Sequence, residues 1–417
     1  MQPRPEAMGL GKRVAALGTM TILVAACGGT SSAPTRTAPS TAAQSAPTAS
    51  PEASKPTPAD TKLEAGERPT NGRIVFYRTD DARSTNTPFS IQPDGTNETE
   101  LRDGGIEPGT WSPDRSRLVV SHLVPDQSPV PAWQTAWQRP AVLNADGSGF
   151  RLLDAYPDRK MHLNPLGWTG DGSRIYVYGG GEDASSADMG LYTVRASDGA
   201  DLTRIFQTPA GTNDFAVLSP DRSKILVNRS SNDFDRALFV VDTDGSNFWR
   251  ITTPELNVVD LEFYDGVSSD WSPDGSKIAF GAQLAGDGDP PSLFVMDAGG
   301  GARHAIVSPT IGAVSAQWSP DGRLIAFSSK LRDRPQVWVV DPNGLGIRQV
   351  TDGADGSESI VPMWSPDGHS LVFQRKLHDA VTLWTIAADG TSQKQLSTTP
   401  LAADWVGGYR WWPAIGS

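Results

Sequence analysis

Three histidines are the side chains of this sequence best suited to hold a metal ion. His122, His162 and His378 lie far apart in the sequence, but imidazole is a common ligand of divalent cations, and folding could bring three of them to one ion. They lack the short ligand spacing of a metal motif that is visible in sequence. We therefore interpret them as scattered surface histidines and predict no metal and no other cofactor.

The remaining residues with chemical potential point to turns rather than to catalysis. Asp287-Gly288-Asp289 could contact calcium, yet it lacks the ligand set of a calcium loop, and Asp242-Thr243-Asp244-Gly245 has the composition of a hairpin turn. The sequence contains no Gly-x-Ser-x-Gly nucleophile elbow. No catalytic residue is predicted, and an enzymatic activity is the weaker interpretation.

Two tryptophans, Trp133 and Trp137, are candidates for ligand contact. They lie in a Pro- and Gln-rich stretch, residues 122–139, whose composition cannot build a core of its own. Two alternatives stay open for the pair. The side chains fold back over the channel mouth as a plug, or they anchor a partner or a sugar ring, because interface hot spots favour tryptophan.

The only cysteine, Cys27, follows a basic segment and an apolar run over residues 14–26. This run is too short to span a bilayer and has the length of a signal-peptide core. It ends in Val-Ala-Ala-Cys, which resembles the lipobox of bacterial lipoproteins, where the cysteine is acylated and becomes the new N-terminus. We predict a lipoprotein signal peptide over residues 1–26, and a lipid on Cys27 that anchors the chain outside the cytoplasm to a bacterial membrane. The alternative is an ordinary secretory signal with an incidental cysteine.

The segment that begins at the cysteine, residues 27–69, is dominated by Ser, Thr, Ala and Pro. It has too few large apolar side chains to offset the entropy of ordering, and we predict a disordered tether. The whole chain carries a net charge of −12, which argues against a nucleic-acid partner because a phosphate backbone requires clustered cations. We expect a monomer.

From residue 70 onward, a short turn motif recurs along the chain. The spacing between successive copies is 46 to 57 residues, which is typical of propeller blades or of a solenoid. The copies begin at Trp111, Trp168, Leu218, Trp271, Trp318 and Trp364, and a truncated copy begins at Trp411. In Trp-Ser-Pro-Asp-Gly, Pro presets φ and Gly accepts a left-handed conformation. Arg115 and Arg222 replace that Gly at an expected cost of about 1 kcal/mol each. We predict that the repeated tryptophans pack between blades.

Four β-rich runs in each repeat identify the repeats as blades. Residues 73–79, 88–92 and 98–103 form three runs with no preceding motif, and residues 409–413 form one run with no successor. Together they complete one blade and leave no open edge. The sequence therefore predicts an all-β fold over residues 70–417, a seven-bladed β-propeller of four-stranded antiparallel blades closed by its C-terminal strand.

The Trp-Ser-Pro-Asp-Gly signature, complete at residues 271–275, 318–322 and 364–368, resembles the repeat of TolB-like β-propellers. This resemblance implies the fold and does not specify a function. TolB itself carries an α/β domain before a six-bladed propeller, whereas here the tether leads directly into strands and seven blades are expected. The partners of TolB are therefore not transferred to this chain.

Alternating strands place the connections of each blade on two rims. The turns between the first and second strands and between the third and fourth strands form one rim, which we call the short-turn rim. The other connections form the loop-rich rim, where irregular loops on a rigid scaffold favour function. Its predicted loops cover residues 122–139, 179–189, 254–266, 282–291 and 352–360.

Two functions follow from this arrangement. The favoured one is a non-catalytic envelope protein that binds another protein or a cell-wall polymer through the loop-rich rim, with Trp133, Trp137, His122, His162 and His378 as candidate contacts. The alternative is a polysaccharide-active enzyme on the same rim, resembling the propeller lyases that act on pectin fragments and use a histidine-bound metal.

Overall fold

The computed structural model divides the chain into two units, Met1–Lys62 and Leu63–Ser417. It describes residues 71–80, 85–100, 106–124, 137–144, 148–155, 161–180, 188–209, 212–231, 236–259, 269–284, 290–329, 334–378, 380–401 and 409–413. The predicted signal peptide, Cys27, the tether, Trp133 and the Asp287-Gly288-Asp289 segment lie outside these ranges. Across the described ranges all regular elements are strands, and no helix has the length and hydrophobicity of a membrane span.

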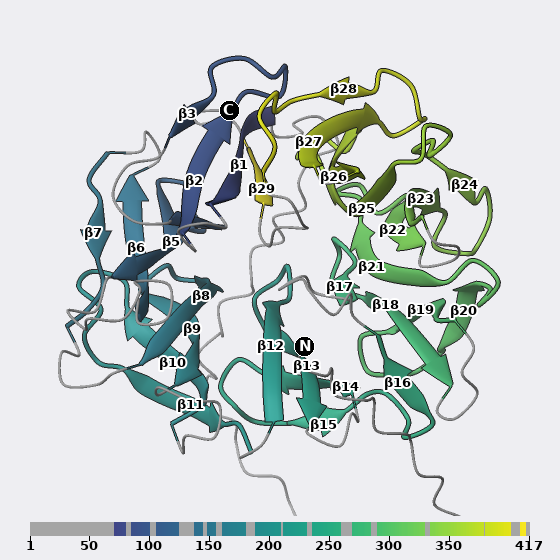
Figure 1. The fold of residues 1–417 in the computed structure, drawn as a ribbon. Coiled ribbons are helices and arrows are strands. Elements are labelled where there is room, and N and C mark those ends of the chain that lie inside the picture. Colours follow the sequence, from purple (N-terminus) through teal and green to yellow (C-terminus); the bar gives the residue numbers. More distant parts are fainter. Residues whose placement is uncertain are drawn as a thin grey trace, which may run out of the picture. The chain divides into compact units, whose positions relative to one another are not determined.

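The strands form seven antiparallel sheets, which are arranged as the blades of one ring in the second unit (Figure 1). Blade 1 consists of β29–β1–β2–β3, and blades 2, 3 and 4 consist of β4–β7, β8–β11 and β12–β15. Blade 5 consists of β16–β20, and blades 6 and 7 consist of β21–β24 and β25–β28. The predicted all-β, seven-bladed propeller is confirmed.

The strands of the first four blades have the following bounds. They are β1 (Asn71–Asp80), β2 (Thr85–Ile91), β3 (Thr99–Glu100), β4 (Ile106–Trp111), β5 (Arg117–Val124), β6 (Trp137–Asn144), β7 (Arg151–Leu152), β8 (His162–Trp168), β9 (Arg174–Gly180), β10 (Gly190–Arg195), β11 (Thr203–Gln207), β12 (Thr212–Leu218), β13 (Lys224–Ser231), β14 (Arg236–Asp242) and β15 (Trp249–Arg250).

The strands of the last three blades, with the closing strand, have the following bounds. They are β16 (Leu256–Val258), β17 (Ser269–Trp271), β18 (Lys277–Leu284), β19 (Ser292–Asp297), β20 (His304–Val307), β21 (Ala313–Trp318), β22 (Ile325–Ser329), β23 (Gln336–Val340), β24 (Arg348–Gln349), β25 (Glu358–Trp364), β26 (Ser370–Leu377), β27 (Ala380–Ala387), β28 (Lys394–Gln395) and β29 (Tyr409–Pro413).

Closure of the ring is made by β29, which covers residues 409–413 as the sequence predicts. It pairs antiparallel with β1, in a register that places Ile74 opposite Trp411 and Phe76 opposite Tyr409. The last strand of the chain therefore becomes the inner strand of the first blade. This pairing satisfies an edge that an open ring would expose.

The turn between the first and second strands of a blade is held by the side chains of its own motif. In blade 5, Ser272 Oγ donates to Asp274 Oδ1 at 2.6 Å, and Lys277 N donates back to Ser272 Oγ at 2.9 Å. Gly275 then adopts a φ of +69°. Arg115 and Arg222 adopt the same left-handed conformation, with φ values of +56° and +61°, and their turns still form, as predicted.

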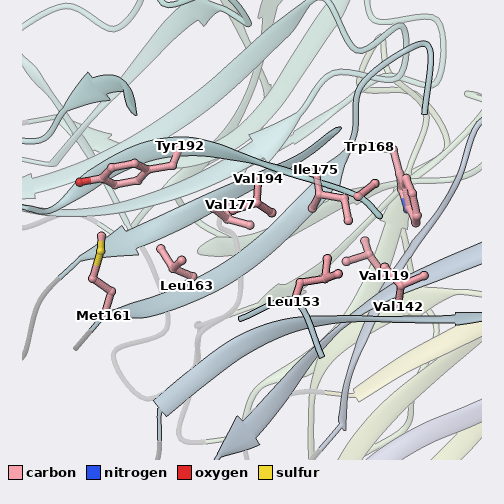
Figure 2. Close-up of a cluster of buried hydrophobic side chains, with 11 residues drawn as sticks. Val119, Val142, Leu153, Met161, Leu163, Trp168, Ile175, Val177, Tyr192 and Val194 are labelled. Carbon is pink, nitrogen blue, oxygen red and sulfur yellow. The ribbon is translucent and has the colours of Figure 1, made fainter. Parts of the chain in front are cut away.

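Four of the motif tryptophans lie between neighbouring blades, and the side chain of Trp411 is outside the described residues. The side chains of Trp168, Trp271, Trp318 and Trp364 are buried, whereas that of Trp111 is half-buried. Figure 2 shows one such interface, where Val119 and Val142 of blade 2 pack against Trp168 and the core residues of blade 3. Six clusters of this kind bury apolar side chains from two neighbouring sheets, so stability accrues between neighbouring blades.

Several predicted loop bounds are wrong, because strands extend further than turn residues indicate. Trp137 is the first residue of β6 rather than part of a loop. In blade 5, the predicted loop 254–266 contains β16, which pairs with β18 beside β17. The cause is a short apolar alternation, since Leu256 and Val258 are buried and Asn257 between them is not.

Candidate binding rims

The two rims of the propeller differ in the regularity of their connections. First-to-second turns lie within narrow limits, for example 112–116, 169–173 and 365–369, and third-to-fourth turns are equally uniform, for example 243–248 and 388–393. On the loop-rich rim, second-to-third connections range from 378–379 in blade 7 to 125–136 in blade 2. Turn chemistry therefore fixes one rim, while the other varies from blade to blade.

The three candidate histidines lie in three different blades. His122 is in β5 of blade 2, His162 begins β8 of blade 3, and His378 is exposed in the β26–β27 turn of blade 7. The ring of His122 meets that of Phe150 edge-on at 5.0 Å. His162 Nδ1 accepts a hydrogen bond of 3.4 Å from the backbone N–H of Gln138. These contacts are structural, and no three potential ligands converge as a metal site within the described residues.

Of the two candidate tryptophans, the structure places only the backbone of Trp137. It pairs with Val124 at the loop-rich end of blade 2. Trp133 lies in the 125–136 segment, outside the described residues. Both alternatives for the pair, a plug and a ligand anchor, therefore stay open.

The β24–β25 loop on this rim is described in full, and it is held by a polar network. Arg375 Nη2 donates to Asp355 Oδ2 at 2.5 Å, and its Nε donates to Ser357 Oγ at 2.9 Å. Hydrogen bonds from Ser357, assisted by Arg375, lower the pKa of Asp355 to about 2. Gln336 Nε2 also donates to the carbonyl of Ser357 at 2.8 Å. Blade 7 thus presents an ordered, charged loop beside blade 6.

Sequence reasoning missed a stack that recurs on the second and third strands. A guanidinium from the loop-rich half of the second strand covers an aromatic ring of the third strand. The pairs are Arg78 with Phe89 at 4.4 Å, Arg229 with Phe239 at 5.0 Å, and Arg375 with Trp384 at 4.5 Å. Aligning the blades reveals it, because each arginine holds the same register in its strand. The stack fixes the direction of a cation close to the rim.

Comparison with known proteins identifies the architecture. Residues 263–404 match the family model described as the TolB beta propeller domain. The folded unit is a TolB-like β-propeller. No curated protein matches the sequence at a significant level. TolB from Acinetobacter baumannii is 17% identical, with a TM-score of 0.43, over 76% of this chain and 77% of that one.

Two other solved propellers are similar in fold. Oligogalacturonate lyase from Vibrio parahaemolyticus is 14% identical, with a TM-score of 0.54, over 76% of this chain and 86% of that one. The β-propeller domain of the Trilobed protease from Pyrococcus furiosus is 13% identical, with a TM-score of 0.53, over 81% and 96%. That domain is described as having an open velcro topology, whereas here β29 closes the TolB-like propeller onto β1. At these identities the likeness concerns the fold alone.

Proposed function

We propose that this protein is a lipid-anchored, extracytoplasmic scaffold whose propeller binds a protein or a cell-wall polymer through the loop-rich rim. The contrast between the rims supports this proposal. Second-to-third connections vary from 378–379 to 125–136 around one ring, although closure of the ring requires only short turns. Loops of unequal length on a rigid scaffold are the usual place for ligand contacts.

The anchor is supported by the sequence before the propeller. Cys27 follows an apolar run of signal-peptide length, and Val-Ala-Ala-Cys resembles a lipobox. Changing Cys27 to Ser should move the protein from the membrane fraction to the medium or the periplasm. Thr30→Ala, three residues further on, serves as the matched control and should leave the protein in the membrane fraction. A Cys27→Ser protein that stays there would exclude the lipid anchor.

The binding surface is tested with the double variant Trp133→Ala, Trp137→Ala. If the pair anchors a ligand, the immobilised propeller should capture less cell-wall polymer or envelope protein. The free energy of binding should weaken by about 2 kcal/mol per hot spot, while the melting temperature stays unchanged. If the pair is a plug, stability should fall by about 3–5 kcal/mol for each buried tryptophan.

The matched control for that variant is Leu345→Ala on the short-turn rim, where Leu345 is 68% exposed. This variant should change neither capture nor melting. If the tryptophan variant likewise changes neither quantity, or if the control loses capture equally, the loop-rich rim is the wrong surface.

A further inference from the structure

Two arginines occupy a backbone position that four other blades reserve for glycine. In the first-to-second turns, Gly172, Gly275, Gly322 and Gly368 have φ values of +68° to +73°. Arg115 in blade 2 and Arg222 in blade 4 hold the same left-handed conformation. Such a conformation costs a side-chain-bearing residue about 1 kcal/mol. Glycine at either position would remove this strain.

Arg115 is exposed, whereas the side chain of Arg222 is directed across the blades. Its Nη2 lies 3.4 Å from the backbone carbonyl of Trp111 and donates to it. Trp111 ends β4 of blade 2, and Arg222 follows β12 of blade 4, so the contact passes blade 3. In Figure 1 the β12–β13 turn points toward the middle of the ring.

The ends of the inner strands converge at this place. Gly167 near the end of β8 lies close to both neighbouring blades, because a Cβ there would lie 2.9 Å from Leu218 Cδ2 of blade 4. The same Cβ would lie 3.4 Å from Thr110 Oγ1 of blade 2. Blades 2, 3 and 4 therefore approach one another at the inner edge of the short-turn rim, where Arg222 bridges the outer two.

The guanidinium of Arg222 is half-buried and has no acidic partner among the described residues. Among those residues, its single hydrogen bond goes to the Trp111 carbonyl. Desolvation lowers the pKa of Arg222, and no nearby carboxylate of the described chain offsets this shift. The neighbouring Lys224 differs, because its Nζ pairs with Asp242 Oδ1 at 2.5 Å. Removing a cation from water without compensation is unfavourable. The remaining N–H groups can therefore gain from an anionic acceptor.

We propose that Arg222 forms an oxyanion-binding site at the inner edge of the short-turn rim, between the ends of β4 and β12. The ligand is a carboxylate or a phosphate group, since the planar N–H fork of a guanidinium matches both. The site lies on the rim opposite the proposed polymer- or protein-binding loops. The two proposals therefore stand or fall separately.

The test uses the melting temperature of the purified full chain with acetate or inorganic phosphate, against chloride at equal ionic strength. A bound anion stabilises the folded state in proportion to RT ln(1 + [L]/Kd). Arg222→Gly removes the guanidinium and restores the residue that four other blades carry, so this variant is expected to fold. Arg115→Gly makes the same backbone change at an exposed position and is the matched control.

The wild-type protein and Arg115→Gly should gain melting temperature with at least one anion, and Arg222→Gly should bind that anion at least tenfold more weakly. A response to acetate alone assigns a carboxylate ligand, and a response to phosphate alone assigns a phosphate ligand. The proposal is overturned if neither anion exceeds chloride with the wild-type protein. It is equally overturned if Arg222→Gly responds like the wild type, or if Arg115→Gly loses the response to the same extent.

Discussion

At the scale of single residues, the aspartates of the first-to-second turns show how a local motif controls ionisation. Thr169 Oγ1 donates to Asp171 Oδ1 at 2.6 Å, and the backbone N–H of Ser173 donates to the same oxygen at 3.0 Å. These bonds favour the charged form and lower the pKa of Asp171 to about 2 from 3.8. Asp114 is held at a pKa of about 2 in the same way, first by Ser112.

The sign of these shifts predicts the response of the fold to acid. Because the folded-state pKa is depressed, the stabilisation is complete above about pH 4 and is lost as pH falls from 4 through 2. Asp171→Asn keeps the accepting oxygen and removes the titration. Urea unfolding at pH 6, 4 and 2.5 should show a shallower acid loss for Asp171→Asn than for the wild type. Parallel losses in the two proteins would contradict this assignment.

At the scale of elements, neighbouring blades are joined by a repeated hydrogen bond as well as by apolar contact. The indole N–H of a turn tryptophan donates to a carbonyl near the end of the preceding inner strand. The bonds are Trp168 to Thr110 at 2.9 Å, Trp271 to Val217 at 3.3 Å and Trp364 to Gln317 at 3.0 Å. Trp318 differs, because its buried Nε1 has no acceptor among the described residues.

This difference predicts unequal effects of the same substitution. Trp318 and Trp364 are almost equally buried, 7% and 6% exposed, so Trp→Phe removes similar apolar contact at both sites. Trp364→Phe also leaves the Gln317 carbonyl without its partner and should destabilise the propeller by about 1 kcal/mol more than Trp318→Phe. The urea midpoints of the two variants measure this difference. Equal midpoints would show that the indole bond contributes nothing net.

At the scale of the whole molecule, a single short strand joins the two ends of the propeller sequence. β29 pairs with β1, and Lys394 Nζ of blade 7 donates to the carbonyl of Asp94 in blade 1 at 2.6 Å. Contacts between residues about 300 positions apart in the sequence therefore complete the ring. Every other blade contacts the blades that precede and follow it in the sequence. Such a closure is entropically expensive and stabilises the ring only when it is intact.

Removal of this strand should therefore affect the whole propeller. Deleting residues 405–417 exposes the edge of β1 and the apolar faces of two blades, so we expect loss of the cooperative transition or aggregation. The control deletion of residues 28–60, in the predicted tether, should leave the melting temperature nearly unchanged. Circular dichroism melts and size-exclusion profiles test both. If the 405–417 deletion melts like the full propeller, β29 does not close the ring.

The sequence by itself determined the blade count, the motif turns and the closing strand over residues 409–413. These features depend on short-range rules: the alternation of apolar residues, the φ preference of Pro and the left-handed tolerance of Gly. Only the tertiary structure decided that His122, His162 and His378 form no three-ligand metal site among the described residues, that β16 joins blade 5, and that Arg222 reaches Trp111. These features depend on how successive sheets twist and meet near the axis of the ring. The local sequence does not encode the distance between residues of different blades.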